Sequence, residues 1–500
     1  MTTAAVSSRE REMREESRKS PEYVIKANSH RELISEAGKR DIDMVDLRFV
    51  DLYGIWHHTT VPLDNFDENS LKKGIGFDGS SIPGFQEIHE SDMLLMPDLK
   101  TARQDPFSKD TLALICNVTD PKTGKTYSRD SRYVAQKATE HLKRSGVADV
   151  SYWGPEMEFY IFDDIRFEQR EGEAFYKIDS EEAPWNTGTR MEGRNLGHRA
   201  RYKGGYFPVS TDALKNLRAE MSRNLQRVGI PVEMQHHEVG AAGQAEIDMH
   251  FDDLVTMADN SMWYVHITKE NAKKEKKLVT FMPKPIFGDN GSGMHVHQSL
   301  WKGKGEDAKN VFYDKTGYAL LSEEALHYIG GLLAHAPALC AIIAPTTNSY
   351  RRLIPGFEAP VNLVLSAGNR SAAVRIPEYS ENPGARRVEF RTPDPTANRY
   401  LAFSAMLMAG LDGIERKIDP GKPIDKDIYK LPQEELAKIR SVPRSLDEAL
   451  DALERDNEFL YKGNVFTPDL LNKYVEIKRA ETQEVRERPH PHEFALYSHY

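Results

Sequence analysis

The segment at residues 287–299 constrains the fold most, because a loop rich in glycine and asparagine runs directly into a short alternating strand. Side chains two residues apart lie on one face of a strand, so His295 and His297 point one way and Met294 and Val296 the other. Two imidazoles beside a polar loop suit a metal ion and an anionic ligand. Taken alone, the segment fits an exposed hairpin with no function equally well.

A second segment, residues 154–162, brings two carboxylates to one side of the chain. The pattern predicts a strand that begins after a turn, so that Glu156 and Glu158 share one face with Cα atoms ~7 Å apart. The alternative is a solvated strand face. The apolar run 160–162 argues against it, because this run predicts burial on both faces.

Two further acidic segments have a similar pattern. Arg387, Glu389 and Arg391 would share one strand face, although an ordinary amphipathic strand with cross-strand ion pairs has the same pattern. Glu238 and Glu246 flank a run of small residues that allows a sharp bend. Two surface glutamates at the ends of a loop are an equally good interpretation of that segment.

If these strands are neighbours, five carboxylates and at least one imidazole line one cavity. Two bare carboxylates ~4 Å apart repel by ~4 kcal/mol at an effective dielectric near 20, so such a group would hold protons or recruit cations. Oxygen-rich sites favour Mg²⁺ or Mn²⁺, and paired ions are common in phosphoryl chemistry. Arginines in segments 348–358 and 368–375 could bind carboxylate or phosphate, although a surface ion pair is the alternative for any one of them. The combination indicates phosphoryl transfer by positioning and charge.

Composition excludes several other classes of protein. A chain of 500 residues allows two or three domains, and the formal net charge of −10 argues against a nucleic-acid binder. Cys116 and Cys340 lie in apolar runs without metal-type spacing, which predicts buried thiols in a reducing compartment. The charged start resembles no signal peptide, and the apolar stretch 326–345 predicts a buried helix, so we expect a cytoplasmic protein.

Periodicity predicts a small α/β domain followed by a larger one in which strands alternate with helices. Residues 41–60 alternate as paired strands with a turn near 52–54, and residues 112–118 form another strand. The helical patterns cover residues 31–40, 134–145, 212–228, 254–276, 322–343 and 399–416.

From about residue 46 to the C-terminus, the chain resembles type I glutamine synthetase, the bacterial-type glutamate–ammonia ligase. Six blocks in family order carry the resemblance: residues 77–82, 154–159, 284–287 leading into the His295 strand, 348–360, 369–371 and 386–395.

The resemblance implies an α+β or α/β fold, with a β-grasp-like N-terminal domain and a large catalytic domain whose curved antiparallel sheet is flanked by helices. We expect a charged, flexible extension over residues 1–25, the small domain over 26–130 and the catalytic domain over 131–500. The implied reaction uses ATP to phosphorylate L-glutamate, and ammonia then displaces phosphate from γ-glutamyl phosphate to give L-glutamine, ADP and phosphate. The resemblance also implies a dodecamer of two stacked hexameric rings, with active sites shared between subunits.

The matched positions imply two divalent ions, Mg²⁺ or Mn²⁺, per active site. The implied ligands are Glu158, Glu238 and Glu246 for the first ion and Glu156, His295 and Glu389 for the second, which would contact the γ-phosphate. The implied nucleotide contacts are Glu238, Phe251, His297, Ser299, Arg370, Arg375 and Arg387. Arg370 and Arg375 would also stabilise the phosphoryl group during transfer.

For glutamate, the resemblance implies that Arg352 and Arg391 bind the carboxylates and that Asn290 and Gly291 hold the amino-acid end. Glu158, His295 and Arg370 are further implied substrate contacts.

For ammonia, the resemblance implies that Asp78 takes a proton from ammonium while reaching in from a neighbouring subunit. Ser81, Tyr206 and Glu358 would complete the ammonium pocket, and Glu358 would lie on a loop that excludes water from the acyl phosphate. Tyr429 matches a position that some bacterial members modify with AMP, and a plain loop tyrosine is the alternative.

Three positions depart from the common family pattern. Gly368 stands where an arginine is frequent, and Gly384 lies near the usual place of a phosphate-binding lysine, in a segment one residue longer. Met157 replaces a usual proline.

Other classes remain alternatives. A ligase that joins glutamate to a polyamine or another amine would keep the metal and ATP sites but change the ammonium pocket. A structural homologue without activity should have lost metal ligands, and none of the six is missing. A guanidine-phosphorylating kinase would need a reactive cysteine near a matched motif, and neither cysteine meets that condition.

Overall fold

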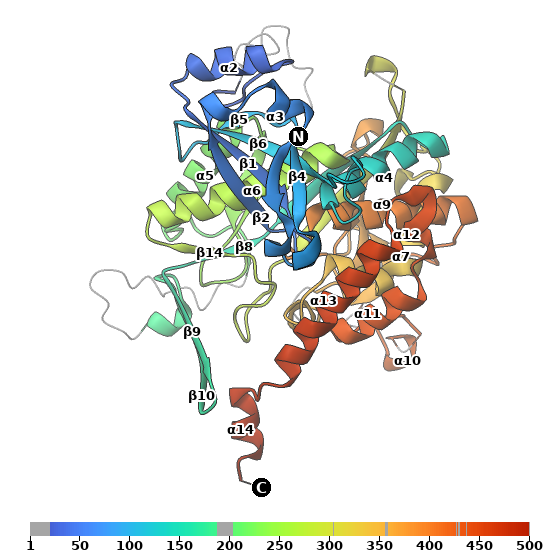
Figure 1. The fold of residues 1–500 in the computed structure, drawn as a ribbon. Coiled ribbons are helices and arrows are strands. Elements are labelled where there is room, and N and C mark those ends of the chain that lie inside the picture. Colours follow the sequence, from blue (N-terminus) through green and yellow to red (C-terminus); the bar gives the residue numbers. More distant parts are fainter. Residues whose placement is uncertain are drawn as a thin grey trace.

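The computed structural model describes residues 21–187, 204–303, 305–355, 359–426, 428, 431–436 and 438–499. In this part of the chain the strands form four sheets, and helices pack around them (Figure 1).

The N-terminal part forms a small sheet beside the larger body, in blue in Figure 1. Its strands are β1 (Met44–Val50), β2 (Trp56–Pro62), β3 (Ile75–Asp78), β4 (Asp92–Pro97), β5 (Arg103–Gln104) and β6 (Thr111–Thr119). Their order is β2-β1-β6-β4-β3, with β5 beside β6, and β1 is parallel to β6. Leu33 of helix α2 (His30–Gly38) shares a core with Leu47 and Leu114 of this sheet, and the short helix α3 (Glu68–Lys72) lies next to β4.

The larger sheet carries most of the site. Its strands are β7 (Val150–Met157), β13 (Asp252–Asp253), β15 (Met294–Lys302), β16 (Lys309–Asn310), β17 (Asn362–Ala367), β18 (Ala372–Ile376) and β19 (Val388–Phe390). Their order is β13-β7-β15-β19-β18-β17, with β16 beside β15. In this order the histidine strand β15 lies between the carboxylate strands β7 and β19, because β15 pairs antiparallel with both.

Two smaller sheets extend from this one. The first contains β8 (Phe159–Phe162), β11 (Val232–His237), β12 (Gln244–Met249) and β14 (Leu278–Thr280) in the order β11-β12-β8-β14. The second is a hairpin of β9 (Asp164–Arg170) and β10 (Glu173–Asp179), which projects away from the body (Figure 1).

Helices enclose the large sheet in one continuous apolar core. They are α4 (Ser131–Ser145), α5 (Lys215–Arg227), α6 (Leu254–Lys274), α7 (Glu323–Ile343), α8 (Ser349–Arg352), α9 (Arg399–Arg416), α11 (Leu446–Arg455), α12 (Glu458–Tyr461) and α13 (Pro468–Arg486). Helix α10 (Gln433–Leu436) packs against a smaller cluster, and α14 (Pro491–Tyr497) has no buried residue and projects from the body (Figure 1). Helix α7 is long and apolar enough to cross a membrane, but 78% of its most apolar window is buried inside the fold. This burial is typical of a core helix, as the sequence predicts.

The structure confirms the predicted helices and paired strands, with ends that differ by a few residues. The turn near residues 52–54 is also present: Gly54 has φ +82°, and a Cβ there would lie 2.7 Å from the Asn398 Cα. Only glycine fits so close an approach at positive φ. This contact joins the small sheet to the start of α9.

The prediction that one strand begins after a turn at residues 154–155 is wrong. Strand β7 begins at Val150 and passes through Gly154 and Pro155 without a turn, because Pro155 pairs opposite Val296 in the sheet. The chain then changes sheets at Glu158, since β7 belongs to the large sheet and β8 to the smaller one. The predicted burial of residues 160–162 is confirmed.

Candidate active site

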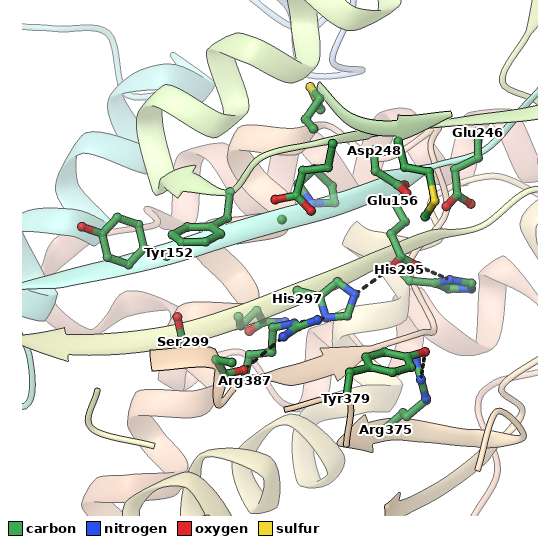
Figure 2. Close-up of a pocket in the computed structure, with 18 of the residues that line it drawn as sticks. Tyr152, Glu156, Glu246, Asp248, His295, His297, Ser299, Arg375, Tyr379 and Arg387 are labelled. Atoms are coloured by element: carbon green, nitrogen blue, oxygen red, sulfur yellow. Dashed lines mark hydrogen bonds and ion pairs between the residues drawn. The ribbon is translucent and has the colours of Figure 1, made fainter. Parts of the chain in front are cut away.

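A cavity of about 730 Å³ opens between the large sheet and the β11–β12 hairpin (Figure 2). Most of the predicted site residues line it. They are Glu156, Glu158, Tyr206, Glu238, Glu246, Phe251, His295, His297, Ser299, Arg370, Arg375, Arg387 and Arg391. Residues far apart in the sequence therefore meet in one place, as the alternating segments predict.

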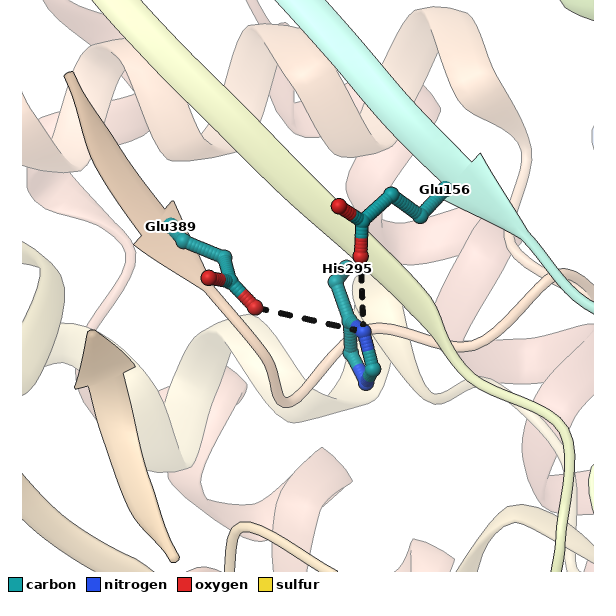
Figure 3. A group of neighbouring side chains, drawn as sticks. All are labelled: Glu156, His295 and Glu389. Atoms are coloured by element: carbon teal, nitrogen blue, oxygen red, sulfur yellow. Dashed lines mark hydrogen bonds and ion pairs between the residues drawn. The ribbon is translucent and has the colours of Figure 1, made fainter. Parts of the chain in front are cut away.

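Glu156, His295 and Glu389 form one cluster of possible metal ligands, with ligand atoms within 4.8 Å of one another (Figure 3). His295 Nδ1 lies 3.1 Å from Glu156 Oε2 and 4.0 Å from Glu389 Oε1. The sheet register explains this geometry, because His295 pairs directly opposite Glu156 across β15 and β7. We call this the sheet cluster.

His236, Glu238 and Glu246 form a second such cluster, which we call the hairpin cluster. His236 Nδ1 lies 3.4 Å from Glu238 Oε1, and His236 Nε2 lies 3.6 Å from Glu246 Oε1. His236 pairs opposite Glu246 across β11 and β12. The sequence prediction missed His236 as a ligand. The sequence feature that could have identified His236 is its position two residues before Glu238, because side chains at this spacing in an extended chain share a face.

Glu158 connects the two clusters at the point where the chain changes sheets. Its Oε1 lies 4.0 Å from His295 Nε2, and its Oε2 accepts hydrogen bonds from the Gln244 side chain and the Gly293 backbone, both at 3.0 Å. Burial raises the pKa of Glu158 to about 8, with a second contribution from the negative charge of Glu238.

The hairpin cluster has too little positive charge for its carboxylates. Burial raises the pKa of Glu246 well above its usual value, and the negative charges of Glu156 and Asp248 raise it further. Asp248, which the sequence prediction also missed, lines the cavity and has a raised pKa, chiefly because of burial. Carboxylate oxygens and an imidazole at this spacing suit a hard divalent cation, which would neutralise their mutual repulsion.

The sheet cluster has the opposite electrostatics. Burial alone would raise the pKa of Glu156, but His297, 2.8 Å from Glu156 Oε1, and His295 hold it well below its usual value. Glu389 is fully buried, and one of its oxygens accepts a hydrogen bond from Arg375 while the other accepts one from Arg391. Burial alone would raise the pKa of Glu389, but the charge of Arg391, together with His297 and His295, lowers it.

The Asn290–Gly291 loop and Arg352 lie beside the cavity. The Arg352 guanidinium donates to the backbone carbonyls of Thr392 at 2.9 Å and Arg391 at 3.0 Å. A Cβ at Gly293 would lie 2.5 Å from Arg352 Nη2, so a side chain there would displace the arginine. The loop is anchored because Tyr160 donates a hydrogen bond to the Asn290 carbonyl at 2.6 Å.

An aromatic wall stands at the end of the cavity opposite the hairpin cluster. The Tyr152 ring lies 5.3 Å from that of Phe251 and 6.0 Å from that of Trp301, both edge-on. Trp301 donates its indole N–H to Ser299 at 3.0 Å. The sequence prediction assigned Phe251 and Ser299 but missed Tyr152 and Trp301. These two side chains lie an even number of residues from Glu156 and His297 on their strands, and therefore on the same face as those cavity residues.

Some predicted residues do not join this cavity. Asp78 and Ser81 lie at the end of β3 in the small sheet, where Asp78 accepts hydrogen bonds from the Ser80 backbone and the Ser81 hydroxyl, both at 2.9 Å. The Ser80 hydroxyl also donates to Asp78, at 2.6 Å, and this bond, followed by the other two, lowers the pKa of Asp78. Glu358 and Tyr429 lie outside the described residues, as does most of the predicted N-terminal extension.

Comparison with known proteins agrees with this geometry. Residues 41–121 match the family model described as the glutamine synthetase beta-Grasp domain, and residues 128–497 match the glutamine synthetase catalytic domain. The chain belongs to the glutamine synthetase family. A glutamine synthetase of Frankia alni is 57% identical over 460 residues, which cover 91% of this chain and 96% of that one.

Solved structures extend the likeness to the fold. A glutamine synthetase of Plasmodium falciparum superimposes with a TM-score of 0.86 and is 29% identical, covering 95% of this chain and 99% of that one. A structure titled as a GmaS/ADP complex gives a TM-score of 0.78 at 27% identity, with 94% and 99% covered. The predicted fold class is confirmed. The chain is a ligase that forms glutamine in an ATP-dependent reaction and uses a divalent metal.

Proposed function

We propose that the cavity is the site of glutamine formation and that it holds two divalent cations. The observation that carries the proposal is the meeting of the sheet cluster and the hairpin cluster beside a row of arginines. The proposed ligands are Glu156, His295 and Glu389 for one ion, and Glu158, Glu238 and Glu246 for the other, with His236 as a further candidate. Bound there, the cations would neutralise charge on the phosphoryl oxygens.

The chain's own arginines would bind both substrates. Arg370, Arg375 and Arg387 line one side of the cavity and would contact the phosphates of ATP, with the base toward the aromatic wall. Arg352 and Arg391, beside the Asn290–Gly291 loop, would bind the glutamate carboxylates. This arrangement would bring the glutamate side chain toward the terminal phosphate of ATP.

Ammonium handling is proposed to require a second subunit. Asp78 is exposed at the end of β3 and is ionised at neutral pH, as a proton acceptor must be, and its hydrogen bonds lower its pKa further. We propose that it enters a neighbour's cavity near Tyr206, with Ser81 beside it, and that Glu358 closes the site. The proposed assembly, a dodecamer of two hexameric rings, is supported by exposed apolar side chains on two projecting elements, Phe167 on β9 and Phe494 on α14 (Figure 1).

The organisation of the chain is also part of the proposal. It comprises a division into residues 1–25, 26–130 and 131–500, a cytoplasmic location and AMP attachment at Tyr429.

The direct test is formation of L-glutamine from L-glutamate, ATP and ammonia, with Mg²⁺ and Mn²⁺ compared. A panel of amines should show release of phosphate with ammonia above all others. Phosphate release with another amine and none with ammonia would contradict the proposal. In Asp78→Ala, phosphorylation of glutamate should remain detectable while ammonia use is lost, and equal loss of both half-reactions would refute the role of Asp78.

A further inference from the structure

Tyr379 lies in the loop after β18, at the edge of the cavity, and its side chain faces Arg375 (Figure 2). Its hydroxyl accepts a hydrogen bond from Arg375 Nη2 at 2.6 Å, and the guanidinium carbon lies 5.3 Å from the centre of the tyrosine ring. The tyrosine is 72% exposed, whereas Arg375 is buried. Packing in the core therefore does not account for the position of Tyr379.

Arg375 is held on its other side by a carboxylate with several partners. Its Nη1 donates to Glu389, whose second oxygen accepts from Arg391 and lies 4.0 Å from His295. The strength of the Glu389–Arg375 bond therefore depends on what else binds this carboxylate. The hydrogen bond to Tyr379 does not depend on it, so Tyr379 fixes the guanidinium plane independently.

The part of the loop around Tyr379, residues 377–385, contains no lysine or arginine. Gly384, at its end, lines the cavity without a side chain, and its backbone N–H donates to Asn382 at 2.9 Å. Positive charge here comes from Arg375 on β18 and from Arg387, which directly precedes β19. Their effect on a phosphoryl group depends on orientation, because guanidinium donors are directional.

We propose that Tyr379 is a positioning residue, which holds the Arg375 guanidinium in the orientation that meets the phosphoryl group during transfer. The inference rests on the proposed function of Arg375 and extends it to a residue that the family resemblance does not assign. The tyrosine acts by one hydrogen bond and by ring contact, and it takes no part in bond making.

The test compares Tyr379→Phe, which keeps the ring and loses the hydroxyl, with the wild type. We expect kcat for glutamine formation to fall about tenfold and the KM for ATP to change less than twofold, because the lost hydrogen bond to a charged group acts mainly in the transition state. The thermal midpoint should stay unchanged because the tyrosine is mostly exposed. Tyr133→Phe is a matched control, because the Tyr133 ring also lies near a cation, with the Lys137 ammonium 5.1 Å from its centre. Both residues lie on α4, outside the cavity, so this change should leave kcat and the KM for ATP unaltered.

A double-mutant cycle with Arg375→Lys tests whether the effect passes through the arginine. Tyr379→Phe should have no further effect in the Arg375→Lys background. The affinity for ADP together with aluminium fluoride, which mimics the phosphoryl group during transfer, gives the same cycle without turnover when it is measured by calorimetry. An unchanged kcat in Tyr379→Phe, an equal loss in both backgrounds, or a matching fall in thermal midpoint would overturn the proposal. A wild type that forms no glutamine would instead contradict the proposed function, and the ADP cycle would still test Tyr379.

Discussion

The two sides of the cavity contain the same residue type in opposite electrostatic states. On the hairpin side, Glu158 and Glu246 face other carboxylates, and burial raises their pKa values. On the sheet side, Glu389 lies between Arg375 and Arg391, and its pKa is lowered although it is fully buried. Burial alone therefore does not decide the charge of a glutamate here. The difference shows which carboxylates lack a positively charged side chain beside them in the metal-free protein and which have arginine as a partner.

The largest expected effect follows from removing the charge of Glu389. Glu389→Gln should lower the free energy of unfolding of the metal-free protein by about 3 kcal/mol, because two buried arginines lose a charged partner. Urea denaturation at a fixed protein concentration measures the change. Glu246→Gln is the matched control on the hairpin side. It should not lower the free energy of unfolding, since it removes repulsion between neighbouring carboxylates. Equal losses in both variants would abolish the distinction between the two sides.

The second prediction concerns pH and metal removal. A carboxyl group whose pKa is raised in the folded state destabilises that state as pH rises above its unfolded value, since the unfolded chain ionises first. The metal-free protein should therefore become less stable as the pH rises from about 4.5 to 8, because Glu158 ionises later in the folded state than in the unfolded chain. Binding of Mg²⁺ or Mn²⁺ should restore this stability. The metal-induced increase in thermal midpoint should be larger at pH 8 than at pH 6. An increase that is independent of pH would contradict this reading.

His236 tests the hairpin side by itself. Replacement by Asn should weaken Mn²⁺ binding about tenfold, as loss of a ligand or of a group next to one does, with little change in the stability of the metal-free protein. Titration of Mn²⁺ followed by electron paramagnetic resonance measures the affinity. His250→Asn, an exposed histidine on the same hairpin, is the control. If both variants bind Mn²⁺ like the wild type, His236 is no part of the metal site.

The smallest effect is expected on the sheet side, at Arg387. Its Nε donates to His297 Nδ1 at 3.2 Å, and Lys keeps the charge but not this donor. Arg387→Lys should raise the KM for ATP about threefold and leave Mn²⁺ binding unchanged. Steady-state kinetics at saturating glutamate give the value, and weaker metal binding would show that the two sides are less separate than the structure indicates.

Local patterns predicted the strands and the residue types of this site, because alternation places neighbouring side chains on opposite faces. His295, Glu156 and Glu389 were identified in this way, and their register brings them together as expected. The exchange of sheets at Glu158 was not predictable, since it depends on which strands pair at long range. His236 and Asp248 were missed because single-residue signals are weak without knowledge of the opposing strand.

A second limit of prediction from the sequence concerns the hydroxyl of Tyr379 and the aromatic partners of Phe251. Tyr379 follows β18 in a loop with no periodic pattern, so only its contact with Arg375 reveals a role. Tyr152 and Trp301 lie on strands 149 residues apart in sequence but are adjacent in the sheet, where Tyr152 pairs opposite Ser299. The small domain is recognisable from sequence, but the proposed entry of Asp78 into a neighbour's cavity depends on how subunits assemble.

The central claim is that both clusters hold a cation, and the number and position of bound Mn²⁺ ions test it most directly. Anomalous diffraction from crystals of the Mn²⁺-loaded protein should show two ions in each cavity, one at Glu156, His295 and Glu389 and one at Glu238 and Glu246. A single ion in the cavity, or ions bound only elsewhere on the chain, would contradict the account.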